Sequence, residues 1–135
     1  MLADAAAISR LTESIIRCAI SVHRALGPGL LEEPYKLALA NELLNAGLAF
    51  ELDVQLTAMY RGDSLGCSYY MDIVVENLVV LEIKSVTHIL PVHRAQLLTY
   101  LKFSGHPAGL ILNFNTELMK DGIARVLNDK PGHRR

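Results

Sequence analysis

Three charged residues lie close together in a stretch of the chain that is otherwise mostly apolar. Asp72 precedes Glu82 by ten positions, and Lys84 follows Glu82 by two. If residues 70–84 form a hairpin centred on Asn77, Asp72 lies opposite Glu82 with the two Cβ atoms about 5 Å apart. Lys84 shares the face of Glu82, because alternate residues of a strand point to the same side. The spacing predicts that two carboxylates and an ammonium group converge at one end of a hairpin.

This convergence is unfavourable unless something compensates for it. Neighbouring carboxylates repel each other, and each resists burial unless it is paired or bound to a metal. A Mg²⁺ ion relieves the repulsion, since it takes one or two carboxylates together with waters and substrate phosphate oxygens. Lys84 would then position or deprotonate the attacking water, or stabilise charge developing on phosphorus. The alternative is a salt-bridged hairpin end at which Lys84 only neutralises Glu82.

The elements that must position these residues follow from the apolar pattern and the turn signals. Gly27-Pro28-Gly29 ends the first helix, and Pro34 is tolerated only in the first turn of the second. The prediction is helices at 5–25, 31–45 and 91–103, one or two strands in 50–60, a turn at 61–64, strands at 66–75, 79–86 and 109–114, and a strand or a helical turn at 123–127. The expected fold is α/β, a mixed sheet flanked by helices in the order ααβββ(β)αβ(β).

Length and composition narrow the class of protein. The 135 residues, 51% of them hydrophobic and 20% charged, fit one domain over 1–135, with a first helix and Gly-Pro-Gly turn at 1–28 and a flexible tail at 130–135. The net charge of −1 argues against nucleic-acid binding through overall charge, but it allows a local basic patch.

Cysteine usage and hydropathy indicate a reducing setting. Cys18 and Cys67 are expected to be buried free thiols, because they form no CxxC pair and have apolar neighbours. His23, His88 and His93 lack metal-ligand spacing. The sequence has no signal-peptide pattern and no apolar run of about 18 residues, so no membrane span is predicted and a cytoplasmic location is expected.

Motifs along most of the chain resemble a known group of enzymes. Asp72 followed by Glu82-Ile83-Lys84 on the next strand resembles the signature of the PD-(D/E)XK nuclease superfamily. The segment Gly29–Tyr35 resembles the GxxExxY motif, which names a family of small bacterial proteins in that superfamily. The segment Gln96–Tyr100 resembles the QxxxY motif of RecB-type and lambda-exonuclease-type members. The resemblance runs from about residue 15 to residue 126.

The resemblance implies a restriction-endonuclease-like core and a nuclease that depends on Mg²⁺ or Mn²⁺, with nucleic acid, DNA in preference to RNA, as its partner. The residues implied are Asp72, Glu82, Glu32 and the carbonyl of Ile83 as metal ligands, Lys84 beside the attacking water, and Gln96 and Tyr100 positioning Lys84 or the substrate.

The sequence departs from the family pattern in two places, and plainer roles stay open. Met71 stands where the superfamily name has proline, and Pro34 lies inside the GxxExxY segment, which puts the aim of Glu32 in doubt. Glu32 also suits a helix N-terminus through the helix dipole. Tyr35 shares its face and could hold it or be core. Gln96 and Tyr100 share one face of a helix, so a helix–sheet contact is the alternative for them.

Two rival functions follow from the same sequence. One is a module that keeps the fold and binds nucleic acid or protein without cleaving. The other is an interaction protein that forms a homodimer or binds a partner through a sheet edge or the apolar face of the first helix. Five basic residues are either phosphate contacts or ordinary surface residues: Arg61, His88, His93, Arg94 and Lys102.

Overall fold

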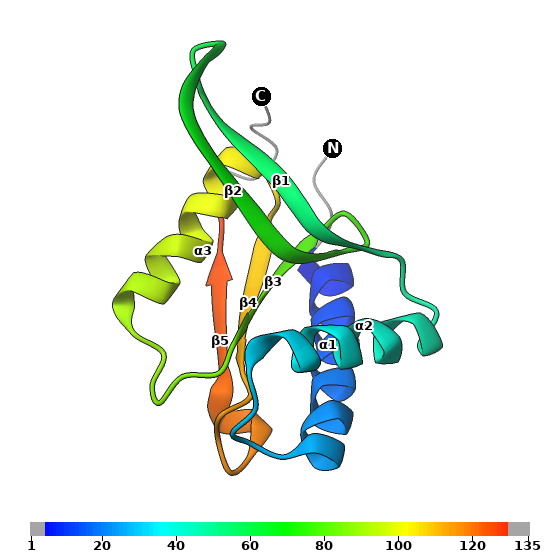
Figure 1. The fold of residues 1–135 in the computed structure, drawn as a ribbon. Coiled ribbons are helices and arrows are strands. Elements are labelled where there is room, and N and C mark those ends of the chain that lie inside the picture. Colours follow the sequence, from blue (N-terminus) through cyan, green and yellow to red (C-terminus); the bar gives the residue numbers. More distant parts are fainter. Residues whose placement is uncertain (1–4, 130–135) are drawn as a thin grey trace.

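Helices and strands follow one another in nearly the predicted order in the computed structural model, which describes residues 5–129 (Figure 1). The elements are α1 (Ala5–Leu26), α2 (Glu32–Asn45), β1 (Phe50–Tyr60), β2 (Asp63–Val75), β3 (Val79–Lys84), α3 (Pro91–Ser104), β4 (Ala108–Asn113), the 3₁₀ turn η1 (Met119–Gly122) and β5 (Ile123–Leu127). The predicted α/β fold is confirmed, while the expected tail at 130–135 lies outside the described residues. None of the helices within 5–129 is long and apolar enough to cross a membrane.

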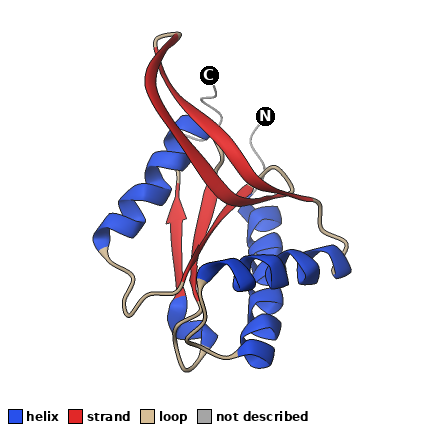
Figure 2. Ribbon diagram, in the orientation of Figure 1, coloured by secondary structure: helices blue, strands red, loops and turns tan. Residues whose placement is uncertain are grey.

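The five strands form one mixed sheet in the order β1-β2-β3-β4-β5. Among the described strands only β3 and β4 run parallel, and α3 makes the crossover between them. The other neighbours are antiparallel. The far end of the β1–β2 hairpin projects away from the helices (Figures 1 and 2).

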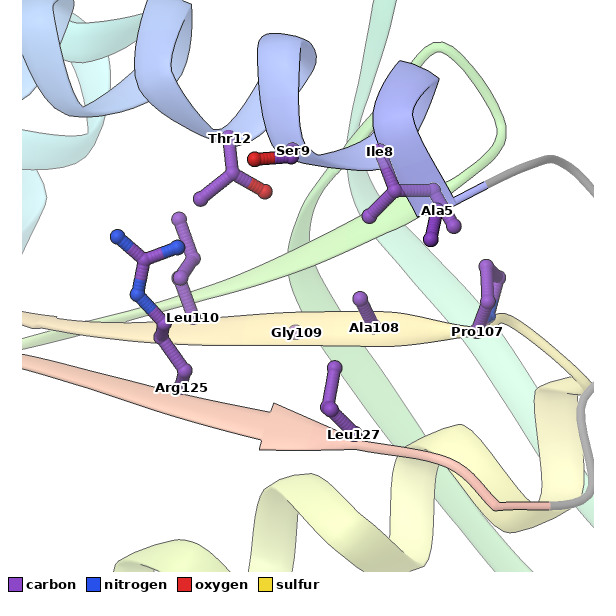
Figure 3. Close-up of a pocket in the computed structure, with 10 residues that line it drawn as sticks. All are labelled: Ala5, Ile8, Ser9, Thr12, Pro107, Ala108, Gly109, Leu110, Arg125 and Leu127. Carbon is purple, nitrogen blue, oxygen red and sulfur yellow. The ribbon is translucent and has the colours of Figure 1, made fainter.

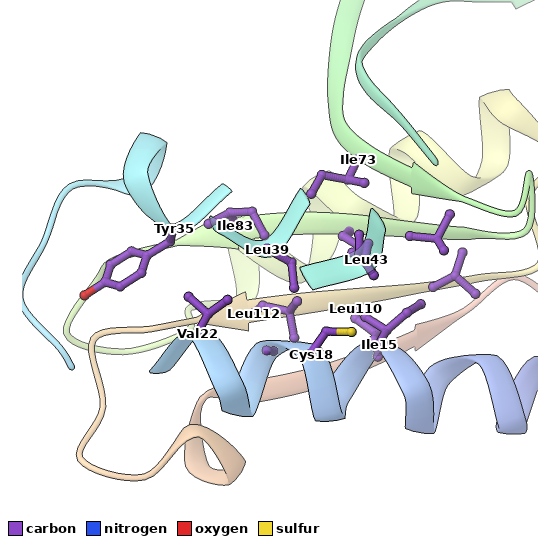
Figure 4. Packing of buried hydrophobic residues seen from close by; sticks show 14 of the residues in the cluster. Ile15, Cys18, Val22, Tyr35, Leu39, Leu43, Ile73, Ile83, Leu110 and Leu112 are labelled. Carbon is purple, nitrogen blue, oxygen red and sulfur yellow. The ribbon is translucent and has the colours of Figure 1, made fainter. Parts of the chain in front are cut away.

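Alternate residues of β3 face two separate cores. Leu81 and Ile83 pack on α1 and α2, in a cluster that includes Ile15 and Leu39 (Figure 4). Val80 faces α3 in the second cluster, which also contains Leu97, Leu101 and Ile111. Burial on both sides explains why β3 and β4 are almost wholly apolar. The apolar face of α1 is therefore largely covered by the sheet and α2, so most of it is not the exposed partner surface that the second rival function allowed.

The start of α2 is fixed by Tyr35. Pro34 falls in the first turn, as predicted. The Tyr35 hydroxyl donates to the Gly27 carbonyl at 2.6 Å and accepts from the Leu30 N–H at 3.1 Å. Its ring stacks on Phe114 with centroids 4.6 Å apart. Tyr35 is therefore a core residue that ties down the loop before α2, the second of the two roles considered for it.

Two strand boundaries differ from the prediction by more than one residue. The turn between β1 and β2 is only Arg61-Gly62, both with positive φ, as a tight two-residue hairpin requires. As a result β2 begins at Asp63 instead of residue 66. By contrast β3 ends at Lys84 instead of residue 86, because the Val86 N–H and carbonyl bond to the Asn113 side chain.

The prediction that both cysteines are buried is correct for one of them. Cys18 is buried in α1, but Cys67 is exposed on β2. Its apolar neighbours in sequence predicted burial, whereas this part of β2 belongs to the projecting hairpin, where no helix covers the sheet (Figure 2).

Candidate active site

The predicted register of the central hairpin is confirmed up to the point where the charged residues begin. Ile73 pairs with Leu81 and Val75 with Val79. Beyond these pairs, side chains replace the backbone ladder. The Ile83 N–H donates to Asp72 Oδ2 at 2.8 Å, and the Asp72 N–H donates to Glu82 Oε2 at 3.1 Å. The two carboxylates therefore lie between the strands where β2 departs from β3.

A bend in the β1–β2 hairpin produces this departure. Met71 and Ile73 belong to different cores although they are two positions apart, so the alternation of β2 breaks at Asp72. On β1, Asp53 lies opposite this point, between the pairs Leu52↔Ile73 and Val54↔Met71, and has a φ of 51°. A left-handed backbone at a residue other than glycine re-aims a strand. The bend turns β2 away from β3 and opens space beside Asp72.

Burial and mutual repulsion perturb both carboxyl groups. Glu82 is only 4% exposed. Its burial, followed by the charge of Asp72, raises the pKa of Glu82 to about 8. Burial also raises the pKa of Asp72, although the hydrogen bond from Ile83 opposes the shift. Near neutral pH this shift favours the protonated form of Glu82, and a nearby cation would favour the carboxylate.

The third charged residue, Lys84, is held by a side chain of α3. Lys84 Nζ donates to Gln96 Oε1 at 3.2 Å. Tyr100 bonds to Gln96 as well, and its ring lies 5.4 Å from that of Tyr69. Burial, then the charges of Glu82 and Asp72, raise the pKa of Tyr100 to about 12, so its hydroxyl stays neutral and can donate. The i, i+4 pair on α3 thus reaches the charged end of the hairpin.

The α2 side supplies further charged groups. Glu32, the first residue of α2, lines a cavity of about 250 Å³ with Glu33, Lys36, Asp72 and Ile83. The charge of Glu32 contributes to raising the pKa of both hairpin carboxyls, which places it near them in spite of Pro34. Lys36 was missed from the sequence, although its i, i+4 spacing from Glu32 puts it on the same helix face.

The five basic residues singled out in the sequence are scattered. Arg61 lies over the Tyr60 ring at the hairpin tip, and Lys102 bonds to Asp129. His93 accepts a hydrogen bond from the Leu90 N–H. His88 and Arg94 line a cavity of about 600 Å³.

A second hollow lies away from the charged residues. This cavity of about 310 Å³ separates α1 from β4 and β5 (Figure 3). Its lining is mainly apolar, with Ile8, Leu110 and Leu127 facing it, and among the described residues that line it only Arg125 is charged. It offers no pair of groups for acid–base or metal chemistry.

The donors around Asp72 fit a small divalent cation. Within residues 5–129, no three Asp, Glu, His or Cys side chains are gathered to hold a metal as they stand. Mg²⁺ needs only one or two protein carboxylates, however, and prefers hard oxygen ligands. The Asp72–Glu82 pair meets that need, and its repulsion is what a cation would relieve.

The motifs and the geometry agree with a family assignment. The family model of the PD-(D/E)XK nuclease superfamily matches residues 9–126, a span that contains every residue of this site. Neither the curated proteins nor the solved structures gave a match. The mixed sheet with its flanking helices is consistent with the fold of that superfamily. This chain belongs to the PD-(D/E)XK nuclease superfamily.

Proposed function

We propose that this protein is a nuclease that hydrolyses phosphodiester bonds in nucleic acid with the help of Mg²⁺ or Mn²⁺. The observation that carries the proposal is the carboxyl pair formed by the half-buried Asp72 and the buried Glu82, with Lys84 held beside them by Gln96. The likeness of Gln96–Tyr100 to the QxxxY motif favours DNA as substrate. The likeness of Gly29–Tyr35 to the GxxExxY motif favours that family within the superfamily.

The roles follow from the positions of the side chains. Asp72 and Glu82 would hold the cation, with Glu32 and the Ile83 carbonyl as further oxygen donors in the same region. The cation, when bound, supplies charge neutralisation at the phosphate and a more acidic water. Lys84 would orient the attacking water or stabilise negative charge on the phosphate. Gln96 fixes the Lys84 ammonium, and Tyr100 offers a neutral hydroxyl as a donor.

A cleavage assay on linear and circular DNA, with Mg²⁺ or Mn²⁺, tests the proposal. Asp72→Asn should abolish metal-dependent cleavage, and Lys84→Met should slow it by about 10²–10³-fold because one charge-stabilising donor is lost. Asp63→Asn makes the same chemical change at the exposed start of β2 and should leave the rate unchanged. Cleavage by Asp72→Asn at the wild-type rate would overturn the proposal.

A second candidate is a binding module that keeps the fold without cleaving. It is favoured by the finding that no three metal-ligating side chains are gathered within residues 5–129. The same assay separates the two, since a binding module would retain DNA and leave it uncut with either metal.

A further inference from the structure

Lys36 is held firmly by two carboxylates. Its Nζ lies 2.6 Å from Asp53 Oδ1 and 3.1 Å from Glu33 Oε1, and its side chain is only 12% exposed. Burial works against its charge, but the hydrogen bonds to Asp53 and Glu33 raise the pKa of Lys36, so the group is an ammonium. An ammonium has three N–H donors, and these two acceptors leave one to spare.

The ammonium of Lys36 belongs to the same cavity as Asp72. Both residues line it, together with Glu32 and Ile83. Among the neighbouring side-chain charges that lower the pKa of Asp72, Lys36 has a larger effect than Lys84. Lys84 ends β3 and is bonded to Gln96 of α3, whereas Lys36 belongs to α2. The carboxylate pair is therefore flanked by two cations.

The local backbone favours a dedicated role for this lysine. Asp53 adopts its left-handed φ of 51° at the bend of β1, a conformation that is unfavourable in most residues other than glycine. From that position its carboxylate reaches across to α2 and holds Lys36. A surface ion pair by itself contributes little stability, so it does not account for the strained backbone. The arrangement is explained if Asp53 serves to hold the Lys36 ammonium at the cavity.

We propose that Lys36 binds a non-bridging oxygen of a substrate phosphate, so that the phosphodiester lies between Lys36 and Lys84. The inference rests on the proposed nuclease function and names a second phosphate contact for that site. Lysine binds phosphate as a point charge, and such contacts position a nucleic acid without reading its sequence. Asp53 is then a positioning residue, which acts only through Lys36.

The test is equilibrium binding of a fluorescently labelled DNA oligonucleotide, with Ca²⁺ in place of Mg²⁺, over a series of salt concentrations. Lys36→Met should weaken binding about tenfold, because a charged hydrogen bond is lost. It should also reduce the slope of log K against log salt by about 1.

Lys36→Arg should keep the slope of the wild-type protein. Asp53→Asn should largely keep it too, since it leaves the lysine charge in place. Thermal unfolding shows which variants are folded, and Lys36→Gln replaces Lys36→Met if the latter is not.

The outcomes separate this inference from the nuclease proposal. If Lys36 only ties α2 to β1, Asp53→Asn and Lys36→Met will weaken binding equally and leave the salt slope at its wild-type value. That result overturns the inference alone, as does unchanged binding by Lys36→Met and Lys36→Gln. If the wild-type protein does not bind the oligonucleotide at all, both the inference and the proposed function are contradicted.

Discussion

The two ends of the β2–β3 hairpin use the same pair of strands in opposite ways. Near the turn, Val75 and Val79 pair through their backbones and are completely buried. At the other end, Asp72 and Glu82 fill the gap between the strands with carboxylates that burial penalises. The apolar end stabilises the fold, and the polar end consumes part of that stability to keep a charged site in place. Carboxylates that are buried at the expense of stability are typical of functional sites.

The largest stability effect should come from shortening a side chain at the apolar end. Leu81→Ala removes a fully buried side chain that faces α1 and α2, and should lower the free energy of unfolding by about 2–5 kcal/mol. Leu65→Ala, on β2 where Leu65 is 51% exposed, should change it by less than about 0.5 kcal/mol. Urea unfolding measures both. Equal losses of unfolding free energy in the two variants would contradict the claim that the apolar end of the hairpin stabilises the fold.

Removing the titrating group at the polar end should instead raise the free energy of unfolding near pH 8 in a metal-free buffer. The pKa of Glu82 is raised in the folded protein to about 8 from 4.5, so folding keeps a proton that the unfolded chain releases. The stability this provides is complete below pH 4.5 and is lost as the pH rises to about 8, by at most about 1.4 kcal/mol per pH unit.

Glu82→Gln isolates this effect, because the amide keeps an oxygen that can accept from the Asp72 N–H. The variant should gain stability relative to wild type as the pH rises from 5 to 8, in urea unfolding with a chelator present. A difference between the two proteins that does not vary with pH would show that Glu82 is not held protonated by its surroundings.

The smallest effect concerns the loop that leads to Glu32. Tyr35→Phe removes the hydroxyl that bonds to Gly27 and Leu30, but keeps the ring on Phe114. It should lower the free energy of unfolding by about 1 kcal/mol. Tyr70→Phe is the matched control, since Tyr70 is 59% exposed on β2. Thermal unfolding compares the pair, and a loss no greater than that of Tyr70→Phe would remove Tyr35 from its anchoring role.

Local patterns were sufficient to predict the hairpin register, the start of α2 with Pro34 in its first turn, and the buried strand β4. Each depends on neighbours in sequence: alternation of side chains, the missing N–H of proline, and an unbroken apolar run. The bend at Asp53 was not predictable, because aspartate has no strong preference for positive φ and the bend follows from long-range pairing with β2. Lys36 was missed for the same reason, since its partner Asp53 is brought to it only by the folded sheet.

The exposure of side chains was likewise predictable only where it depends on neighbours in sequence. The projecting part of the β1–β2 hairpin has apolar residues around Cys67, and composition alone predicts that they are covered. Whether a helix covers a strand depends on the tertiary arrangement, which leaves this part of β2 in solvent.

The central claim is that Asp72 and Glu82 together form a divalent-metal site, and calorimetric titration with Mg²⁺ and Mn²⁺ tests it most directly. Wild type, Asp72→Asn, Glu82→Gln and the control Asp63→Asn are compared with and without a DNA oligonucleotide. The two site variants keep an oxygen for each strand amide, so their unfolding curves should show folded proteins. We expect metal binding by wild type and by Asp63→Asn, and its loss in Asp72→Asn and Glu82→Gln. Metal binding by both site variants with wild-type affinity, or no binding by wild type even with DNA present, would contradict the claim.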